Sequence, residues 1–332
     1  MALIAAKCTQ CGAELQVEST NDATICSYCG SPFITQKAIN HYQVTNKIQA
    51  DVVHVYGSTD FFIRTGTLEE YRGASVDAIL PDDVLRINKN AFRACTGLRS
   101  VHINEGVQAI EAGTFAELEQ LEHVILPQSL KSIGVAAFES CALQQITLPN
   151  GIKHIEPETF SDCTHLSKVT LPNTLKSIGQ GAFKNTALKE IALPDSIDYI
   201  GPQVFSGCTH LAEVSLPENL KHIEEECFFQ CTSLTEIALP DGLESIGRCA
   251  FRDTGLTQIH ILDSVHTLGA HAFVHTNIAQ TNLVLNDVNV KCFYNSPLAS
   301  RYLRRMNGWC EECGGKVSFF NKKCRSCGHI NR

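Results

Sequence analysis

The 332-residue sequence has little of what marks exported, membrane-spanning or catalytic chains. It contains one tryptophan and two methionines, and only 19% of its residues are charged. No apolar run approaches the roughly 18 residues that would span a bilayer. Residues 1–7 are briefly apolar but have no basic lead and no cleavage motif before Cys8, so they are not expected to form a signal peptide. We therefore expect a cytoplasmic protein without a membrane segment.

Motifs of common enzymes are missing as well. There is no glycine-rich phosphate loop, nucleophile elbow or His-Glu-x-x-His motif. Most of the thirteen histidines occupy repeat positions that hold Ser, Tyr or Thr in other units, so these positions do not require a catalytic histidine. The densest group, His260, His266, His271 and His275, leaves a further metal site as an alternative to scattered surface histidines. We do not expect an enzyme.

Charge is distributed unevenly along the chain. The net charge of −8 argues against binding nucleic acid over the whole surface. Residues 301–332 nevertheless carry eight Lys or Arg against two Glu, a net charge of +6. One alternative function is therefore a nucleic-acid-associated protein that contacts phosphates through this basic end.

A phenylalanine recurs every 22 or 23 residues, within units of the form LPxxLxxIGxxAFxxCxxLxxIx. A unit this short cannot bury its own Leu, Ile and Phe, so neighbouring units must stack to make a continuous core. Two short strands per unit, at roughly 4.8 Å per coil, predict a mainly β, right-handed solenoid with parallel sheet, about 43 Å long for nine coils. The anchors are Phe92, Phe115, Phe138, Phe160, Phe183, Phe205, Phe228, Phe251 and Phe273.

These motifs resemble the BspA-like leucine-rich repeat family over residues of about 60–300. Residues 61–73 (FFIRTGTLEEYRG) look like the strand pair that caps the first repeat in that family. At the other end, Ser296 and Pro297 have the chemistry of a helix N-cap and first turn, and Asn307 that of its end. Two caps leave neither end of the stack open, so we expect a monomer.

The sixteen cysteines fall into two classes. Eight belong to the repeats, and the five that follow a phenylalanine by three residues share that place with threonines, which predicts a small buried turn position. The other eight form two clusters of paired Cys-x-x-Cys motifs, and four thiolates match tetrahedral Zn²⁺ with no ligand position left open. We predict two structural Zn²⁺ ions; a redox pair or an iron–sulfur cluster are the alternatives. The ligands are Cys8, Cys11, Cys26 and Cys29 in one cluster and Cys310, Cys313, Cys324 and Cys327 in the other.

The N-terminal cluster resembles the zinc-ribbon module that opens many uncharacterised cytoplasmic proteins of Gram-positive bacteria, which implies metal binding and little about activity. The expected organisation is then a zinc ribbon at each end of the repeat array. Its boundaries are 1–40 for the N-terminal zinc ribbon, 41–79 for a linker and cap strands, 80–285 for nine repeats, 286–307 for a C-terminal cap with a helix, and 308–332 for the C-terminal zinc ribbon.

Repetition also predicts a surface. Small residues lie between the two buried positions of the main strand, and charged residues lie one place before the inner apolar position. Such columns form either a solvated face or a surface that another, unidentified protein can approach closely. We favour a protein–protein interaction scaffold. The residues predicted to contact the partner are Thr147, Thr170, Ser215, Lys168, Glu190, Glu213 and Glu236.

Overall fold

The computed structural model describes residues 60–283 and 289–307, together with short segments near both termini. Near the N-terminus it describes two antiparallel strand pairs: β1 (Leu3–Lys7) with β2 (Glu14–Glu18), and β3 (Ala23–Ile25) with β4 (Pro32–Ile34). In the C-terminal segment it describes Trp309, Cys310, Lys316, Cys324, Ser326, Cys327 and Ile330.

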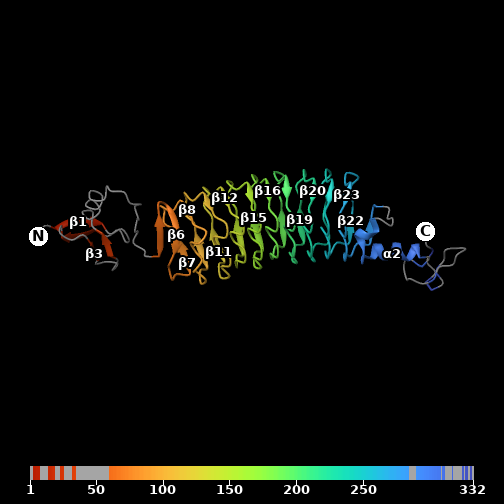
Figure 1. Ribbon diagram of the computed structural model, residues 1–332, viewed down its shortest axis with the longest axis horizontal. Helices are drawn as coiled ribbons and strands as arrows, with labels where there is room; N and C mark the ends of the chain where they lie inside the picture. Colours follow the sequence, from red (N-terminus) through yellow and green to blue (C-terminus); the bar gives the residue numbers. More distant parts are fainter. Residues whose placement is uncertain are drawn as a thin grey trace.

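The repeats coil into an elongated solenoid that is mainly β, as predicted (Figure 1). Most coils contribute a main strand whose central side chain points to the core, while the residues before and after it point to solvent. The coil that carries Glu236 has no strand at this place. These strands pair in parallel, in short ladders along the rod. They are β7 (Asp77–Ile79), β9 (Ser100–His102), β11 (His123–Ile125), β13 (Gln145–Thr147), β15 (Lys168–Thr170), β17 (Glu190–Ala192), β19 (Glu213–Ser215), β22 (Gln258–Ile259) and β24 (Gln280–Thr281).

A second strand follows in each of nine coils and also pairs in parallel with its neighbours. Its second residue is an isoleucine or leucine that faces the core, and its first residue faces outward. These strands are β8 (Arg86–Ile87), β10 (Ala109–Ile110), β12 (Ser132–Ile133), β14 (His154–Ile155), β16 (Ser177–Ile178), β18 (Tyr199–Ile200), β20 (His222–Ile223), β21 (Ser245–Ile246) and β23 (Thr267–Leu268).

The third side of each coil is a turn that also forms a ladder. Around Phe138, the N–H groups of Ala136, Phe138 and Ser140 donate to carbonyls of the next coil over 2.9–3.0 Å. The residues two places before and after the anchor have positive φ, 52° at Ala136 and 56° at Ser140. Left-handed backbone is costly for residues other than glycine, and here it aligns alternate N–H groups with the neighbouring coil.

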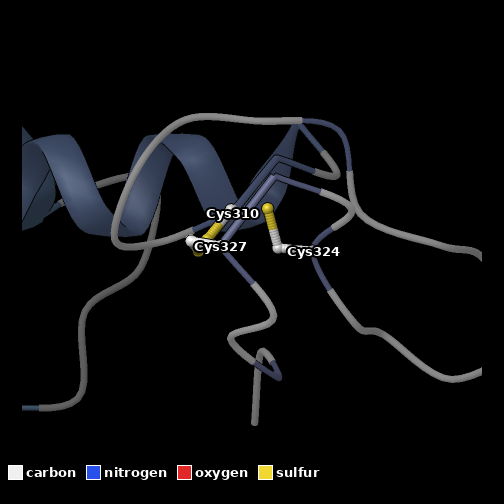
Figure 2. A group of neighbouring side chains, drawn as sticks. All are labelled: Cys310, Cys324 and Cys327. Atoms are coloured by element: carbon white, nitrogen blue, oxygen red, sulfur yellow. The ribbon is translucent and has the colours of Figure 1, made fainter.

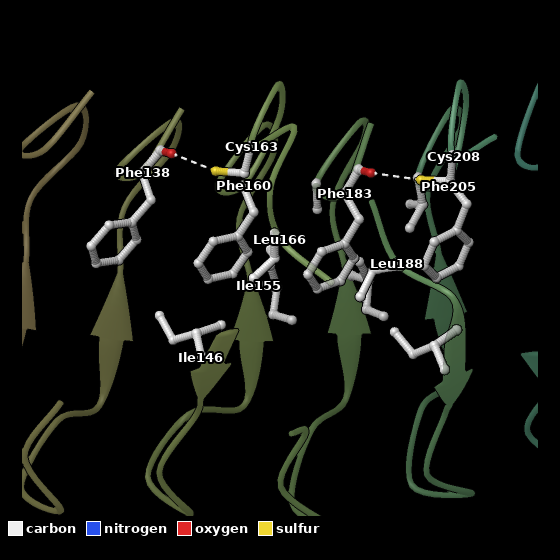
Figure 3. Packing of buried hydrophobic residues seen from close by; sticks show 14 of the residues in the cluster. Phe138, Ile146, Ile155, Phe160, Cys163, Leu166, Phe183, Leu188, Phe205 and Cys208 are labelled. Carbon is white, nitrogen blue, oxygen red and sulfur yellow. Dashed lines mark hydrogen bonds between the residues drawn. The ribbon is translucent and has the colours of Figure 1, made fainter. Parts of the chain in front are cut away.

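The anchor phenylalanines form one column through the core (Figure 3). All nine are fully buried, and from Phe115 to Phe273 neighbouring rings are stacked with centroids 5.2–5.9 Å apart. The column continues beyond the nine anchors, to Tyr71 at one end and to Phe293 at the other. Stacked rings fill the space between coils, so each coil buries its apolar residues against its neighbours rather than within itself.

Each end of the array is closed by a different element. A hairpin of β5 (Phe61–Arg64) and β6 (Thr67–Tyr71) covers the first coil, with β6 parallel to β8. At the other end lie a 3₁₀ helix, η1 (Asn289–Phe293), and the helix α2 (Pro297–Met306), whose first turn is capped by Ser296 Oγ, an acceptor for the Ala299 N–H at 3.1 Å.

Candidate functional site

The main strands present two outward columns of side chains on one face of the rod, which we call the main-strand face. All seven residues predicted for this surface are solvent-exposed. The strand register places Thr147 opposite Thr170 and Glu190 opposite Glu213 on neighbouring coils. The repeat therefore brings residues 22 or 23 positions apart in sequence into adjacent positions on one surface.

Two grooves lie along this face. The larger, of about 850 Å³, runs from β19 to β24 and includes Glu213, Ser215 and Glu236 in its lining. The smaller, of about 530 Å³, includes Lys168, Thr170 and Glu190. Glu213 and Ser215 line both grooves, so the two are continuous. Thr147 lines neither groove and lies one coil further out.

The larger groove extends beyond the residues that were predicted. Gln258 and Gln280 continue the column of Glu213 and Glu236, and His260 continues the column of Ser215. Sequence reasoning missed them because the predicted surface ended at Glu236. The signal that could have found them is the same repeat register, carried through two more units.

Three adjacent carboxylates line these grooves, and Lys168, which lines the smaller groove, does not form an ion pair with any of them. Within the part of the chain that the structure describes, Glu190, Glu213 and Glu236 have no Lys, Arg or His nitrogen within 4.0 Å. Glu190 and Glu213 lie directly opposite each other in a parallel pair. Like charges in that position repel each other, so the acidic column is left electrostatically unbalanced.

On the second-strand face, two lysines form ion pairs. Lys176 lies 3.9 Å from Asp198, and Lys221 lies 3.2 Å from Glu244, each pair joining neighbouring coils. In the next column, His154 Nδ1 hydrogen-bonds to Ser177 Oγ over 2.8 Å, and a His–Ser pair at 222 and 245 repeats this contact at 2.9 Å. These four pairs join polar groups of neighbouring coils on this face.

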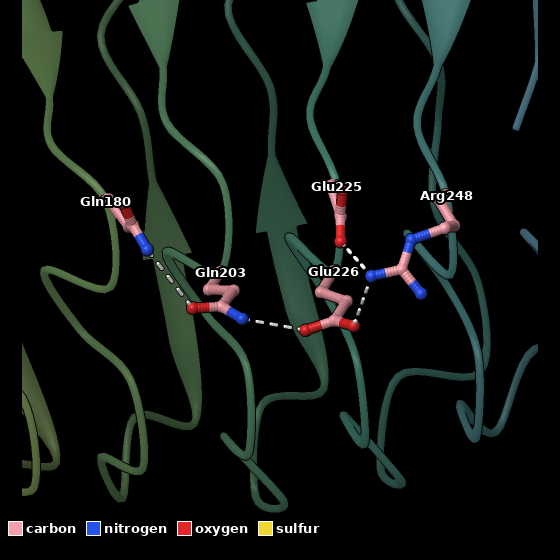
Figure 4. A network of polar contacts seen from close by, with 5 residues as sticks. All are labelled: Gln180, Gln203, Glu225, Glu226 and Arg248. Atoms are coloured by element: carbon pink, nitrogen blue, oxygen red, sulfur yellow. Dashed lines mark hydrogen bonds and ion pairs between the residues drawn. The ribbon is translucent and has the colours of Figure 1, made fainter.

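A similar network follows the second strands (Figure 4). The amide of Gln180 donates to Gln203, whose own amide donates to Glu226, and the Arg248 guanidinium bridges Glu226 and Glu225. The hydrogen bond to Glu225 raises the pKa of Arg248. Each of these five side chains already has a hydrogen-bond or ion-pair partner within the chain. They therefore have few free polar groups with which to bind a ligand.

Near the C-terminus, three cysteines converge (Figure 2). The sulfurs of Cys310, Cys324 and Cys327 all lie within 4.8 Å of one another. The Cys310 and Cys327 sulfurs are 3.6 Å apart, too far for a disulfide of about 2.05 Å. Thiolates at about 2.3 Å from a tetrahedral Zn²⁺ would be roughly 3.8 Å apart, so this spacing suits a shared metal ion.

The backbone around these cysteines also suits a metal ion. The Ser326 N–H donates to Cys324 Sγ over 3.3 Å, which favours the thiolate form. An antiparallel bridge joins Trp309, the residue before Cys310, to Lys316. Three of the four predicted C-terminal ligands are therefore brought together, and the fourth, Cys313, lies outside the described residues.

The N-terminal cysteines Cys8, Cys11, Cys26 and Cys29 also lie outside the described residues. In sequence, the first Cys-x-x-Cys pair falls between β1 and β2, and the second falls between β3 and β4. Both strand pairs are antiparallel. This order, with each Cys-x-x-Cys between two paired strands, is compatible with the expected ribbon.

Four of the five cysteines at the predicted turn position are buried, and the fifth, Cys95, is half-buried. Cys163 Sγ donates to the Phe138 carbonyl and Cys208 Sγ to the Phe183 carbonyl, each over 3.0 Å (Figure 3). Burial raises the pKa of Cys163 to about 12 and that of Cys208 to about 11. Thiols that stay protonated are poor nucleophiles and poor metal ligands, so these residues belong to the core.

Among the described residues, the side chains of the histidine-rich segment do not converge as a group of metal ligands. His275 Nδ1 lies 2.7 Å from Asp253 Oδ1, and its Nε2 lies 2.7 Å from the Asn295 amide, whereas His260 lies in the groove. Among the described residues, the three C-terminal cysteines are the one place where three metal-binding groups converge. A search of the same residues finds no helix with the length and hydropathy to cross a bilayer.

Comparison with known proteins gives the context of this site. The family model for the BspA type leucine rich repeat region matches residues 85–212 and 199–306. A leucine-rich cell surface protein from Faecalibacterium prausnitzii shares the fold, with a TM-score of 0.50 and 22% identity over 70% of this chain and 76% of that protein. A leucine-rich repeat protein from T. pallidum is 26% identical over 75% of this chain and 95% of that one, with a TM-score of 0.45. The comparison with curated proteins gave no match.

Proposed function

We propose that this chain, which belongs to the BspA-type leucine-rich repeat family, is a non-catalytic scaffold that binds another protein through the continuous grooves of its main-strand face. The observation that carries this proposal is the difference between the faces. On the second-strand face, Lys176 and Lys221 form ion pairs across the coils. On the main-strand face, three aligned carboxylates beside small side chains have no ion-pair partner among the described residues.

The chemistry of the described residues supports a binding role rather than catalysis. Cys163, Cys208 and Cys231 of the repeats are buried, and burial raises their pKa values. His275 is held between Asp253 and Asn295, so both of its ring nitrogens are already engaged. Neither arrangement supplies an activated nucleophile beside a general base.

We also propose the domain boundaries and the metal content expected from the sequence, with a zinc ribbon at 1–40 and another at 308–332. One Zn²⁺ would be held by Cys310, Cys324 and Cys327 with Cys313, the other by the four N-terminal cysteines. Four thiolates leave no position for water or substrate, so each ion would cross-link its ribbon rather than take part in a reaction. The spacing of the three described sulfurs supports the C-terminal site.

A cytoplasmic, monomeric protein is part of the same proposal. The eight repeat cysteines form no disulfide within the described part of the chain, which fits a reducing compartment. The β5–β6 hairpin and the helix α2 cover the two ends of the array. Covered ends do not offer a strand edge to a second copy.

The test is to block the groove floor without disturbing the core. Ala238 and Ser215 are exposed, so Ala238→Trp and Ser215→Trp fill the groove while the buried residues stay in place. Wild-type protein is used to capture a partner from an extract of the source cells. We expect either tryptophan to reduce capture at least tenfold, whereas Lys153→Trp on the second-strand face leaves it unchanged. Equal capture by all variants would contradict this binding face.

A further inference from the structure

Resting on the proposed function of the main-strand face, we infer that its partner is a cationic, extended polypeptide segment. This segment lies along the rod axis, with lysine or arginine side chains three residues apart. We base this inference on a column of three unpaired carboxylates that lies beside a floor of small side chains within one continuous groove.

Charge complementarity identifies the sign of the partner. Glu190 and Glu213 face each other across a parallel pair, and Glu236 follows on the next coil. Like charges so placed repel each other, and none of the three has a cation within ion-pair distance among the described residues. A cationic ligand would relieve the repulsion as it binds, whereas an anionic or neutral ligand would not.

The floor of the groove points to a close-lying main chain. Ala192, Ser215 and Ala238 are exposed and small, so a peptide backbone can approach the sheet here more closely than it could over long side chains. The strands cannot accept an added strand on this face, because their backbone groups are already directed to the neighbouring coils. Peptide groups of the partner would instead meet the carboxamides of Gln258 and Gln280.

The spacing of the coils indicates the period of the cations. Neighbouring coils lie about 4.8 Å apart, so Glu190 and Glu236, two coils apart, are separated by about 9.6 Å. A polyproline II segment rises about 3.1 Å per residue and returns to the same side every three residues, after about 9.3 Å. A β-strand returns to the same side after about 6.6 Å, which does not match the column.

The experiment measures binding of synthetic peptides to the full chain by fluorescence anisotropy at low ionic strength. The probe is a labelled (Lys-Pro-Pro)₄ peptide. Its isomer, with the four lysines in one block, has the same composition and charge but lacks the period. We expect the periodic peptide to bind at least threefold more tightly than the isomer, and its affinity to fall as salt is added, since exposed ion pairs are screened.

Variants test the three carboxylates directly. We expect Glu190→Gln, Glu213→Gln and Glu236→Gln each to weaken binding about two- to fivefold, the range for exposed ion pairs. Glu119→Gln, an exposed carboxylate on the turn side, removes the same charge and should leave the affinity unchanged. The inference would be overturned if neither peptide bound or if all variants bound equally. Equal affinity for the two peptides would contradict the three-residue spacing of the cationic side chains.

The two proposals fail in distinguishable ways. If Ala238→Trp abolishes capture of the native partner but the glutamine variants bind that partner normally, the groove is the binding surface and its ligand is not cationic. If Ala238→Trp leaves capture intact, the main-strand face is not the binding surface.

Discussion

At the residue scale, cysteine and threonine are interchangeable three places after each anchor because both satisfy a buried carbonyl. The thiol of Cys208 reaches the Phe183 carbonyl in the preceding coil, whereas the hydroxyl of Thr186 donates to the Phe183 carbonyl of its own coil at 3.0 Å. The two side chains therefore converge on the same acceptor. A side chain of either coil can donate to this buried carbonyl, so the turn stays tight and no unpaired polar group is left in the core.

The buried thiols make the fold sensitive to alkali. In the unfolded chain a thiol ionises near pH 8.5, but burial raises the pKa of Cys163 in the folded chain to about 12. Its contribution to stability is complete below about pH 8.5 and is lost as the pH rises toward 12, because the unfolded state then binds fewer protons. At pH 10 this loss is about 2 kcal/mol for one such thiol.

Cys163→Thr should therefore reduce the pH dependence of unfolding. Threonine occupies this position in other coils and does not titrate. We expect the free energy of unfolding, measured by urea titration, to fall between pH 7 and pH 10 by about 2 kcal/mol less in the variant than in the wild type. The same fall in both proteins would show that this thiol ionises as readily in the fold as in the unfolded chain.

At the element scale, one glycine position sets how closely the second strands stack. A Cβ atom on Gly179 would lie 2.5 Å from the backbone nitrogen of Pro157 in the preceding coil. We expect Gly179→Ala to cost about 1–3 kcal/mol in a urea melt, because the two coils must separate. The equivalent residue one coil earlier, Glu156, already carries a side chain, so Glu156→Ala should cost under about 0.5 kcal/mol. Similar costs for both would contradict this packing limit.

The cysteine clusters allow a prediction about metal removal. We expect elemental analysis of purified protein to find two zinc ions per chain, and Cys324→Ser to remove about one. Cys208→Thr, in the repeat core, should leave the content unchanged. Chelation should unfold the ribbons, since structural zinc contributes on the order of 10 kcal/mol to such modules, while the solenoid keeps most of its circular dichroism. Loss of the solenoid signal on chelation would mean that its core depends on the metal.

Sequence periodicity is sufficient to place most elements but not all of them. The strands and the nine anchors follow from spacing alone, because each coil must present the same residues to its neighbours. Phe293 escaped prediction because it follows Phe273 by 20 residues rather than 22 or 23. The third ladder also escaped, since non-glycine residues such as Ala136 and Ser140 adopt positive φ there without any sequence signal. Their left-handed backbone is imposed by the stacked coils.

For the binding surface, the sequence predicts which residues face outward but not which charged side chains form ion pairs. Six of the seven predicted residues line the grooves because the repeat register fixes which side chains face outward. Whether a charge is paired depends on side-chain reach across coils. Lys221 reaches Glu244 at 3.2 Å, whereas Lys168 and Glu190, which line the same groove, form no ion pair among the described residues.

At the scale of the whole molecule, stability is expected to be that of a linear array. Each coil contacts only its neighbours, so unfolding can begin at an end or at a damaged coil. Trp309, the one tryptophan, follows α2, and its N–H donates to the Arg304 carbonyl at 2.7 Å. Its fluorescence therefore reports on the C-terminal end, while circular dichroism reports on all the coils.

Two phenylalanine variants separate central from terminal damage. Phe183 is stacked between Phe160 and Phe205, with centroids 5.5 and 5.9 Å away, whereas Phe293 is stacked on Phe273 alone among the described rings. We expect Phe183→Ala to cost about 3–5 kcal/mol and to broaden the urea transition seen by circular dichroism, because the array divides into two weaker halves. Phe293→Ala should cost less and should lower the midpoint of the Trp309 fluorescence transition below that of the circular dichroism. Equal costs with coincident transitions would mean that the solenoid unfolds as a single cooperative unit rather than as a chain of coupled coils.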